Sequence, residues 1–332
     1  MSLSKKGFAL ALSAALGGGF VTSASADVYS RSQLAVQGLN ISYFNFGEDS
    51  VVQPAFPAES IFTFNTQANA KLDNIPESAA NESCFGVRTQ GNLFGSCVEQ
   101  IPVLSGDAAN ASAASANQRG ESDYSFFGAD GTDYSNAESE ITTAFLVDFQ
   151  NPTGTEQIAE TNLVNSKNGS GGTVVQSTTE LGITFALGEN ATFVLEFEAE
   201  VDALAEVTGA SQGVSQSNVN VSVSLSDGQG TVFGEWIPRS TDSQNFTCLT
   251  GLDCDESTPF SLNSTLTSSG APSALQDTGD FRFTIAGLES GIYVLGLAAK
   301  TSTQAINIPA PGSLLLMGIG LLAAGSLRRV RK

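Results

Sequence analysis

Residues 181–201 read LGITFALGENATFVLEFEAEV. The second half of this stretch alternates between two kinds of side chain. The apolar positions are Phe193, Leu195, Phe197, Ala199 and Val201, and the polar positions include Glu196, Glu198 and Glu200. A period of two predicts a β-strand with one face on a core and the other in solvent. Because Gly188-Glu189-Asn190 separates this strand from an apolar run at 181–187, the stretch predicts a β-hairpin.

The three glutamates would form a row of like charges on the outer face of that strand. Such a row costs stability unless cations or basic partners lie opposite. A solvated sheet face is the simplest interpretation, and a cation-binding or glycan-facing surface is the functional one. A glycosidase site would need further carboxylates from other strands.

Short strand patterns recur on both sides of this stretch. They cover residues 28–36 and 39–46 around Gly38, 60–64, 141–149, 219–225, 231–237, 260–266, 281–285 and 291–299. Asp227-Gly228 predicts a hairpin turn, and residues 291–299, apolar on both faces, predict a central, fully buried strand. Many short strands without a long amphipathic helix predict an all-β fold, an antiparallel β-sandwich with a jelly roll as one variant.

The strand pattern fades between residues 65 and 120. We interpret this part as a loop-rich insertion, with a short helix at 108–118 as an alternative for its Ala-rich end. No clear break divides the remaining chain. The sequence therefore predicts one exported domain over residues 27–300.

Four cysteines allow three disulfide pairings, and the local one joins Cys84 to Cys97 and Cys248 to Cys254. An even number of cysteines favours disulfides in an oxidising compartment. A structural zinc site is the alternative, and without histidine it would need all four thiolates together.

Composition excludes several classes of function. The chain contains no histidine, which excludes Ser-His-Asp and Cys-His catalytic arrangements and His-containing metal motifs. Of its 14 Lys and Arg residues, six lie in the two terminal segments, whereas all 34 Asp and Glu residues lie between them. The body therefore holds 8 basic residues and has a net charge of −26. Such a body repels nucleic acid, so we expect no nucleic-acid partner.

Two side-chain groups are weak ligand candidates. Asp123, Asp130 and Asp133 lie among glycines, and oxygen-rich glycine loops bind calcium, although the spacing does not match an EF-hand and a solvated turn is the alternative. We expect no other cofactor. Trp236 or Tyr124 could stack on a sugar ring, but a lone tryptophan is more often a core residue.

The N-terminus carries an export signal. Lys5 and Lys6 precede an apolar run at residues 8–21, and Ala24-Ser25-Ala26 is a small-residue cleavage site. The sequence predicts a signal peptide over residues 1–26 and a mature chain that begins at Asp27.

The C-terminal tail has three parts in a fixed order. Ile308-Pro309-Ala310-Pro311 comes first, an uncharged apolar run at 312–327 follows, and the chain ends in a basic cluster of Arg328, Arg329, Arg331 and Lys332. The run predicts a transmembrane helix with the basic residues 328–332 retained in the cytoplasm. We expect residues 301–311 to be an exposed linker between the body and this helix. A simple membrane anchor is the alternative function of the tail.

This tail resembles the PEP-CTERM protein-sorting signal of Gram-negative bacteria, with Ala310 where the family usually has glutamate. The resemblance implies transient residence in the inner membrane and processing near the Pro-x-Pro by an exosortase-type enzyme. It also implies delivery to the cell surface or extracellular matrix, with exopolysaccharide or other matrix components as partners. Because we find no catalytic constellation, we expect a non-enzymatic surface protein associated with biofilm. A carbohydrate-binding sandwich and a secreted carboxylate-based glycoside hydrolase are the alternatives.

Overall fold

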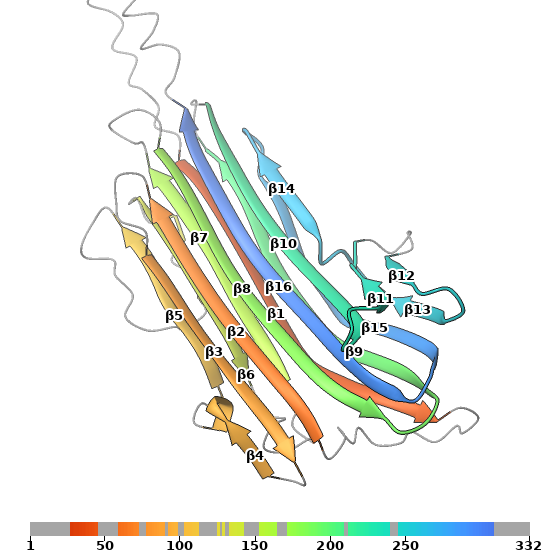
Figure 1. Ribbon diagram of the computed structural model, residues 1–332. Coiled ribbons are helices and arrows are strands. Elements are labelled where there is room, and N and C mark those ends of the chain that lie inside the picture. Colours follow the sequence, from red (N-terminus) through yellow and green to blue (C-terminus); the bar gives the residue numbers. More distant parts are fainter. Residues whose placement is uncertain are drawn as a thin grey trace, which may run out of the picture.

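A computed structural model describes most of the exported body (Figure 1). The described residues are 27–45, 59–72, 78–89, 92–98, 103–112, 125–126, 128–129, 133–142, 153–164, 171–208, 212–239 and 245–308. The predicted signal peptide and the tail beyond Ile308 lie outside them, as do Tyr124, Asp123 and Asp130.

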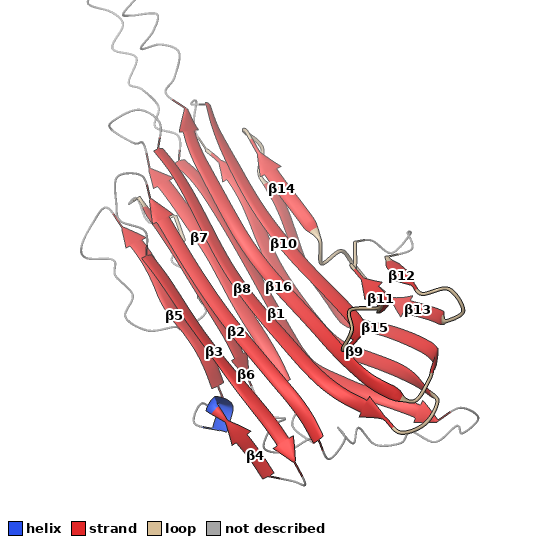
Figure 2. Ribbon diagram, in the orientation of Figure 1, coloured by secondary structure: helices blue, strands red, loops and turns tan. Residues whose placement is uncertain are grey.

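The described chain folds into two antiparallel sheets that face one another (Figures 1 and 2). The seven-stranded sheet has the order β13 (Asp253–Ser257), β15 (Ser273–Leu288), β9 (Ala191–Val207), β1 (Asp27–Asn45), β7 (Thr153–Val164), β6 (Tyr134–Thr142) and β5 (Val103–Ser112). The nine-stranded sheet has the order β12 (Phe246–Cys248), β11 (Val232–Trp236), β10 (Gln212–Asp227), β16 (Gly291–Ile308), β8 (Gly171–Leu187), β2 (Glu59–Leu72), β3 (Ser78–Thr89) and β4 (Asn92–Gly95), with β14 (Ser264–Ser268) also paired to β10.

The all-β class and the antiparallel sandwich are therefore confirmed. The jelly-roll variant stays a prediction: the long strands β1, β2, β7, β8, β9, β10, β15 and β16 alternate between the two sheets, whereas β5-β6-β7 and β10-β11-β12 run as consecutive neighbours within one sheet. Among the described residues, the single helical segment is a 3₁₀ turn, η1 (Ser96–Val98), drawn blue beside β4 in Figure 2.

The stretch at 181–201 forms two strands, but not the hairpin that its pattern predicts. β8 pairs with β16 and β2, whereas β9 pairs with β1 and β15, so the turn between them crosses from one sheet to the other. The inward rings of Phe185 and Phe193 stack across the interior with centroids 5.9 Å apart. A hairpin and such an arch require the same alternation, so periodicity alone could not distinguish them. By contrast, the predicted hairpin through Asp227 is confirmed, because β10 pairs with β11.

The two strands expected around Gly38 are a single strand, β1, with a bulge. Gly38 has a φ of 66°, and the pairing registers with both neighbours shift at this point. Glycine adopts this left-handed conformation without a Cβ penalty, so the chain keeps pairing on both sides of it.

The sandwich is packed differently at its two ends. Towards the turns that join β8 to β9 and β15 to β16, the interior is filled by aromatic rings. Phe197 stacks on Phe281 at 5.3 Å and Trp236 on Phe283 at 5.3 Å. This end supplies most of the large apolar area that drives folding.

Towards the end where β1 begins, the interior is built from small and polar side chains. Its apolar cluster consists largely of alanines with a few branched residues. Buried serines bridge the two sheets: Ser215 and Ser217 of β10 donate to the carbonyls of Tyr29 and Arg31, each at 2.7 Å. Small side chains let the sheets approach closely enough for these bonds, which satisfy polar groups that would otherwise be costly to bury.

The loop-rich insertion expected at residues 65–120 is wrong, and the small inward side chains explain why its strands were not predicted. β2 continues to Leu72, and β3, β4 and β5 follow within the same region. Between Phe64 and Leu72, the inward residues of β2 are Thr66, Ala68 and Ala70, all fully buried. Because these side chains are small, hydropathy gave no alternating signal. The alternative helix at 108–118 is also wrong where it is described, since β5 extends to Ser112.

The last strand is longer and more exposed than expected. β16 is central, as predicted, but it is buried on one face only, and Ile292 is 61% exposed. The strand also continues to Ile308, so the expected linker over 301–311 is wrong as far as that residue. Its inward residues Thr301, Thr303 and Ala305 are buried but small, so they gave no apolar signal.

Candidate functional site

The end of β16 carries the first residues of the sorting tail. Its pairing with β10 continues to Ile308, opposite Gln212, and its pairing with β8 continues to Asn307, opposite Gly171. Asn307 is 7% exposed. The sheet therefore holds the chain on both sides almost to Pro309.

The start of the predicted mature chain lies at the same end of the sandwich. The carbonyl of Asp27 accepts a hydrogen bond of 2.9 Å from the amide of Thr208, just before β10 begins. Gly213 follows Gln212, which pairs with Ile308, and it lies against the side chain of Val28. In Figure 1, β1 begins and β16 ends at the upper end of the sandwich. We call this end, formed by Asp27, Gln212 and Ile308, the junction end.

The other predicted processing residues fall outside the described chain. These are Ala24 and Ala26 before the junction end and Pro309, Ala310, Pro311, Arg328, Arg329, Arg331 and Lys332 after it. Within the described residues, no helix is long and apolar enough to cross a membrane. The predicted helix at 312–327 lies beyond them and stays a prediction.

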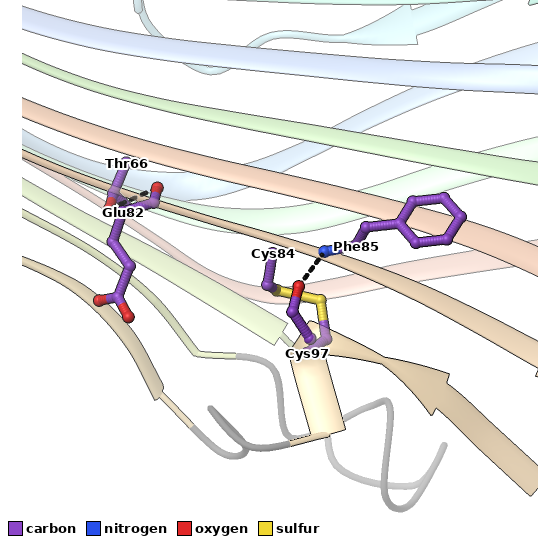
Figure 3. The surroundings of a disulfide bond; sticks show 6 residues. Thr66, Glu82, Cys84, Phe85 and Cys97 are labelled. Atoms are coloured by element: carbon purple, nitrogen blue, oxygen red, sulfur yellow. Dashed lines mark hydrogen bonds between the residues drawn. A yellow bond between two sulfur atoms is a disulfide. The ribbon is translucent and has the colours of Figure 1, made fainter.

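Both predicted disulfides are present, and all four cysteines are used. Cys84 and Cys97 have Cα atoms 4.8 Å apart and join β3 to η1. Phe85, the neighbour of Cys84, is directed away from the disulfide in Figure 3, and its amide donates to the Ser96 hydroxyl at 3.0 Å. Cys248 and Cys254 close the short loop between β12 and β13, with Cα atoms 6.2 Å apart. The Cys84–Cys97 bond is buried against the main core, and the two bonds leave no thiolate set for zinc.

The glutamate row of β9 lies on the outer face of the seven-stranded sheet, as predicted. Arg282 of β15 lies 3.6 Å from Glu196, and Arg31 of β1 makes a two-pronged 2.9 Å contact with Asp202. Between these two ion pairs, Glu198 faces Asp280 across the strands. The row is therefore a solvent-facing acidic strip that is compensated at its ends by two arginines.

The structure gives no support to the calcium site in its described part. Asp133 accepts a 2.6 Å hydrogen bond from the amide of Val164, so its carboxylate caps the end of β7. Burial raises the pKa of Asp133. The hydrogen bond from Val164 lowers this pKa in part, and the nearby Asp27 carboxylate raises it. Among the described residues there is no cluster of three acidic or thiolate ligands that could hold a metal ion.

Trp236 is a core residue and not a sugar platform. It is fully buried, and its indole N–H donates a 2.6 Å hydrogen bond to Glu256. The same carboxylate accepts from the amide of Asn245 and the hydroxyl of Thr258, both at 2.8 Å. The carboxylate therefore organises the base of the disulfide-closed loop, a role that the sequence did not reveal.

Sequence reasoning missed a groove on the outer face of the nine-stranded sheet. Its volume is about 620 Å³, and its floor is made by small residues of three neighbouring strands: Gly182, Ser222, Ser224, Gly296 and Ala298. Phe85 forms part of its wall and is 46% exposed. Asn65 and Glu180 contribute a paired amide and carboxylate, 3.5 Å apart.

A second cleft lies at the opposite end from the junction, between three turns, with a volume of about 810 Å³. Its carboxylates are Asp227 and Glu289. The Asp227 carboxylate accepts hydrogen bonds from the amides of Gln229 and Thr231, both at 2.8 Å, which lower its pKa. This aspartate therefore shapes a turn and is poorly suited to act as a general acid.

Residues 307–332 match the family described as the PEP-CTERM protein-sorting motif. The match begins one residue before Ile308 and runs to the end of the chain. No curated protein and no solved structure matches this chain. The tail is thus a sorting signal that directs export across the membrane to the cell surface, with processing by an exosortase.

Proposed function

We propose that the chain is a non-enzymatic structural protein of the cell surface or extracellular matrix, which functions after its sorting tail has been processed. The sorting motif at 307–332 carries this proposal, because it assigns a destination to the body. Two disulfides, which persist in oxidising compartments, agree with that destination.

The described surface supports a role without catalysis. The acidic strip on β9 is compensated at its ends by Arg31 and Arg282, and the cleft at the turn end has an aspartate held ionised by backbone amides. A glycoside hydrolase needs two carboxylates that flank one sugar bond, one of them kept protonated near neutral pH. The Asp227 carboxylate of the cleft does not fit the protonated role.

A direct test uses the purified body, residues 27–308, with a panel of polysaccharides. We expect no release of reducing sugar above a boiled control. Turnover that disappears in Glu198→Gln or Glu289→Gln would overturn the non-enzymatic proposal and favour a hydrolase.

A second candidate function is polysaccharide binding in the groove that contains Phe85. An exposed ring beside amide, hydroxyl and carboxylate groups is the combination that stacks on a sugar face and bonds its hydroxyls. The remaining outward side chains of the neighbouring strands are mainly Asn, Gln, Ser and Thr, such as Gln176, Asn218 and Ser302, which pair in register across β8, β10 and β16. This face carries little charge in a body that is otherwise strongly acidic, so it can approach a polysaccharide without repulsion.

Pull-down on exopolysaccharide from the native host tests this candidate. Phe85→Ala should reduce the retained protein at least about fivefold, the loss expected for one stacking contact worth about 1 kcal/mol. Ile292→Ala removes an even more exposed apolar side chain outside the groove and should bind like the wild type. Equal retention of all three proteins would eliminate the groove as the binding site.

A further inference from the structure

The last strand of the body occupies the centre of the nine-stranded sheet. β16 pairs with β10 from Tyr293 to Ile308 on one side and with β8 from Gly291 to Asn307 on the other. Without β16 the sheet would separate into a group around β10 and a group around β8. Its inward residues Tyr293, Leu295 and Leu297 also belong to the main core. The body therefore cannot complete its fold until the chain has been exported as far as Ile308.

The sorting motif leaves almost no spacer after that strand. Only residues 309–311 separate Ile308 from the apolar run that begins at Gly312. Even when fully extended, the backbone from Ile308 to Gly312 spans at most about 14 Å. While the tail is in the membrane, the junction end must therefore face the membrane surface closely.

An enzyme that processes a chain commonly binds several residues before the reacting bond in an extended form. Here the residues that precede Pro309 are already extended, but their backbone groups are paired with β10 and β8. Ile306 lies opposite Val214 and Gly172, and Ile308 opposite Gln212. The folded sheet and the enzyme compete for the same short segment.

We propose that the completed sheet masks the segment Ile306–Ile308, so that opening of the last pairs of β16 at the junction end controls the rate of processing. The inference rests on the proposed sorting of this chain and adds a regulatory role for the first residues of β10 and β8. It makes a folded body a slow substrate and an incompletely folded body a fast one. Gln212 and Gly171 act here as positioning residues, because they hold the segment without contacting the reacting bond.

The first test lengthens the spacer in the full chain, expressed in its native host. Six Gly and Ser residues are inserted between Ile308 and Pro309, and a pulse–chase experiment measures the conversion of precursor to mature protein. The rate of conversion should increase roughly tenfold, because one or two terminal hydrogen bonds no longer have to open. The same insertion between Ser269 and Gly270, in an exposed loop, is the matched control and should leave the rate unchanged.

The second test locks the strand. Val214 and Ile306 lie directly opposite one another. Cα atoms of directly opposed antiparallel residues are about 4.5–5.5 Å apart, which is within the range of a disulfide, so Val214→Cys with Ile306→Cys should block processing until reductant is added. Ser226→Cys with Val294→Cys links the same two strands at the far end and should be processed normally.

The outcomes separate this inference from the sorting proposal. An unchanged rate with the long spacer, or normal processing of the locked junction, would overturn the masking of Ile306–Ile308. A wild-type chain that is never processed, and keeps Leu314–Lys332 in its final form, would instead refute sorting itself.

Discussion

Replacement of Trp236 by phenylalanine tests the architecture of the aromatic end of the sandwich. The indole ring stacks on Phe283 and lies 5.7 Å from Phe197, while its N–H bonds to Glu256. Trp236→Phe keeps an aromatic ring in the core but removes the donor. Glu256 would keep its bonds to Asn245 and Thr258 and lose one of its charge-assisted partners.

The expected loss has two parts. A hydrogen bond to a charged acceptor contributes about 1.5–3 kcal/mol. The smaller ring buries roughly 40 Å² less apolar area, which adds about 1 kcal/mol. We therefore expect Trp236→Phe to lower the free energy of unfolding by about 2.5–4 kcal/mol.

Urea unfolding of the mature protein, followed by circular dichroism, measures this change. Ile292→Ala, at an exposed position, should stay within about 0.5 kcal/mol of the wild type. Because Trp236 is fully buried, its substitution should leave polysaccharide binding unchanged wherever the protein is folded. Wild-type stability in Trp236→Phe, or lost binding in a folded variant, would refute the assignment of this tryptophan to the core.

Three further predictions concern stability. Replacement of Cys84 and Cys97 by serine should lower the free energy of unfolding by about 3 kcal/mol. Replacement of Cys248 and Cys254, which close a shorter loop, should lower it by about 2 kcal/mol. Equal or reversed losses in urea unfolding would contradict the loop-length argument. Gly95→Ala should destabilise the β3–β4 edge, because Gly95 has a φ of 109° and an added Cβ would strike the carbonyl of Phe85, whereas Gly270→Ala in open space should be tolerated in the same thermal melts. Burial raises the pKa values of Asp133 and Glu156, so the folded state favours their protonated forms. The melting temperature should therefore rise as pH falls from neutral towards the ordinary carboxyl range. If the double variant Asp133→Asn with Glu156→Gln shows the same rise, the effect comes from the general negative charge instead.

Alternation revealed the strands wherever the inward side chains are large. β9 and β10 were predicted because Phe, Leu and Val alternate there with polar residues. β2 beyond Phe64 and β16 beyond Ala299 were missed, since their inward residues, apart from Leu72, are Thr, Ala or Asn at the narrow end of the sandwich. Hydropathy measures apolar size, and at this end the sheets are joined by small residues and serine hydroxyls.

The pairing of strands with one another and the position of exposed sites were harder to predict than the strands themselves. The pattern around Gly188–Asn190 gave two strands but not their separation into two sheets, which depends on contacts such as Phe185 with Phe193. The local disulfides were predicted because short spacings favour them. The groove containing Phe85 was missed, because its floor joins residues more than 100 positions apart in the chain.

The most direct test of the account is mass spectrometry of the intact mature protein from its native host. We predict a chain that begins at Asp27 and ends near Pro311, without the apolar run and the four terminal basic residues. A mature protein that still carries residues 312–332 would contradict the account and leave the tail as a simple membrane anchor.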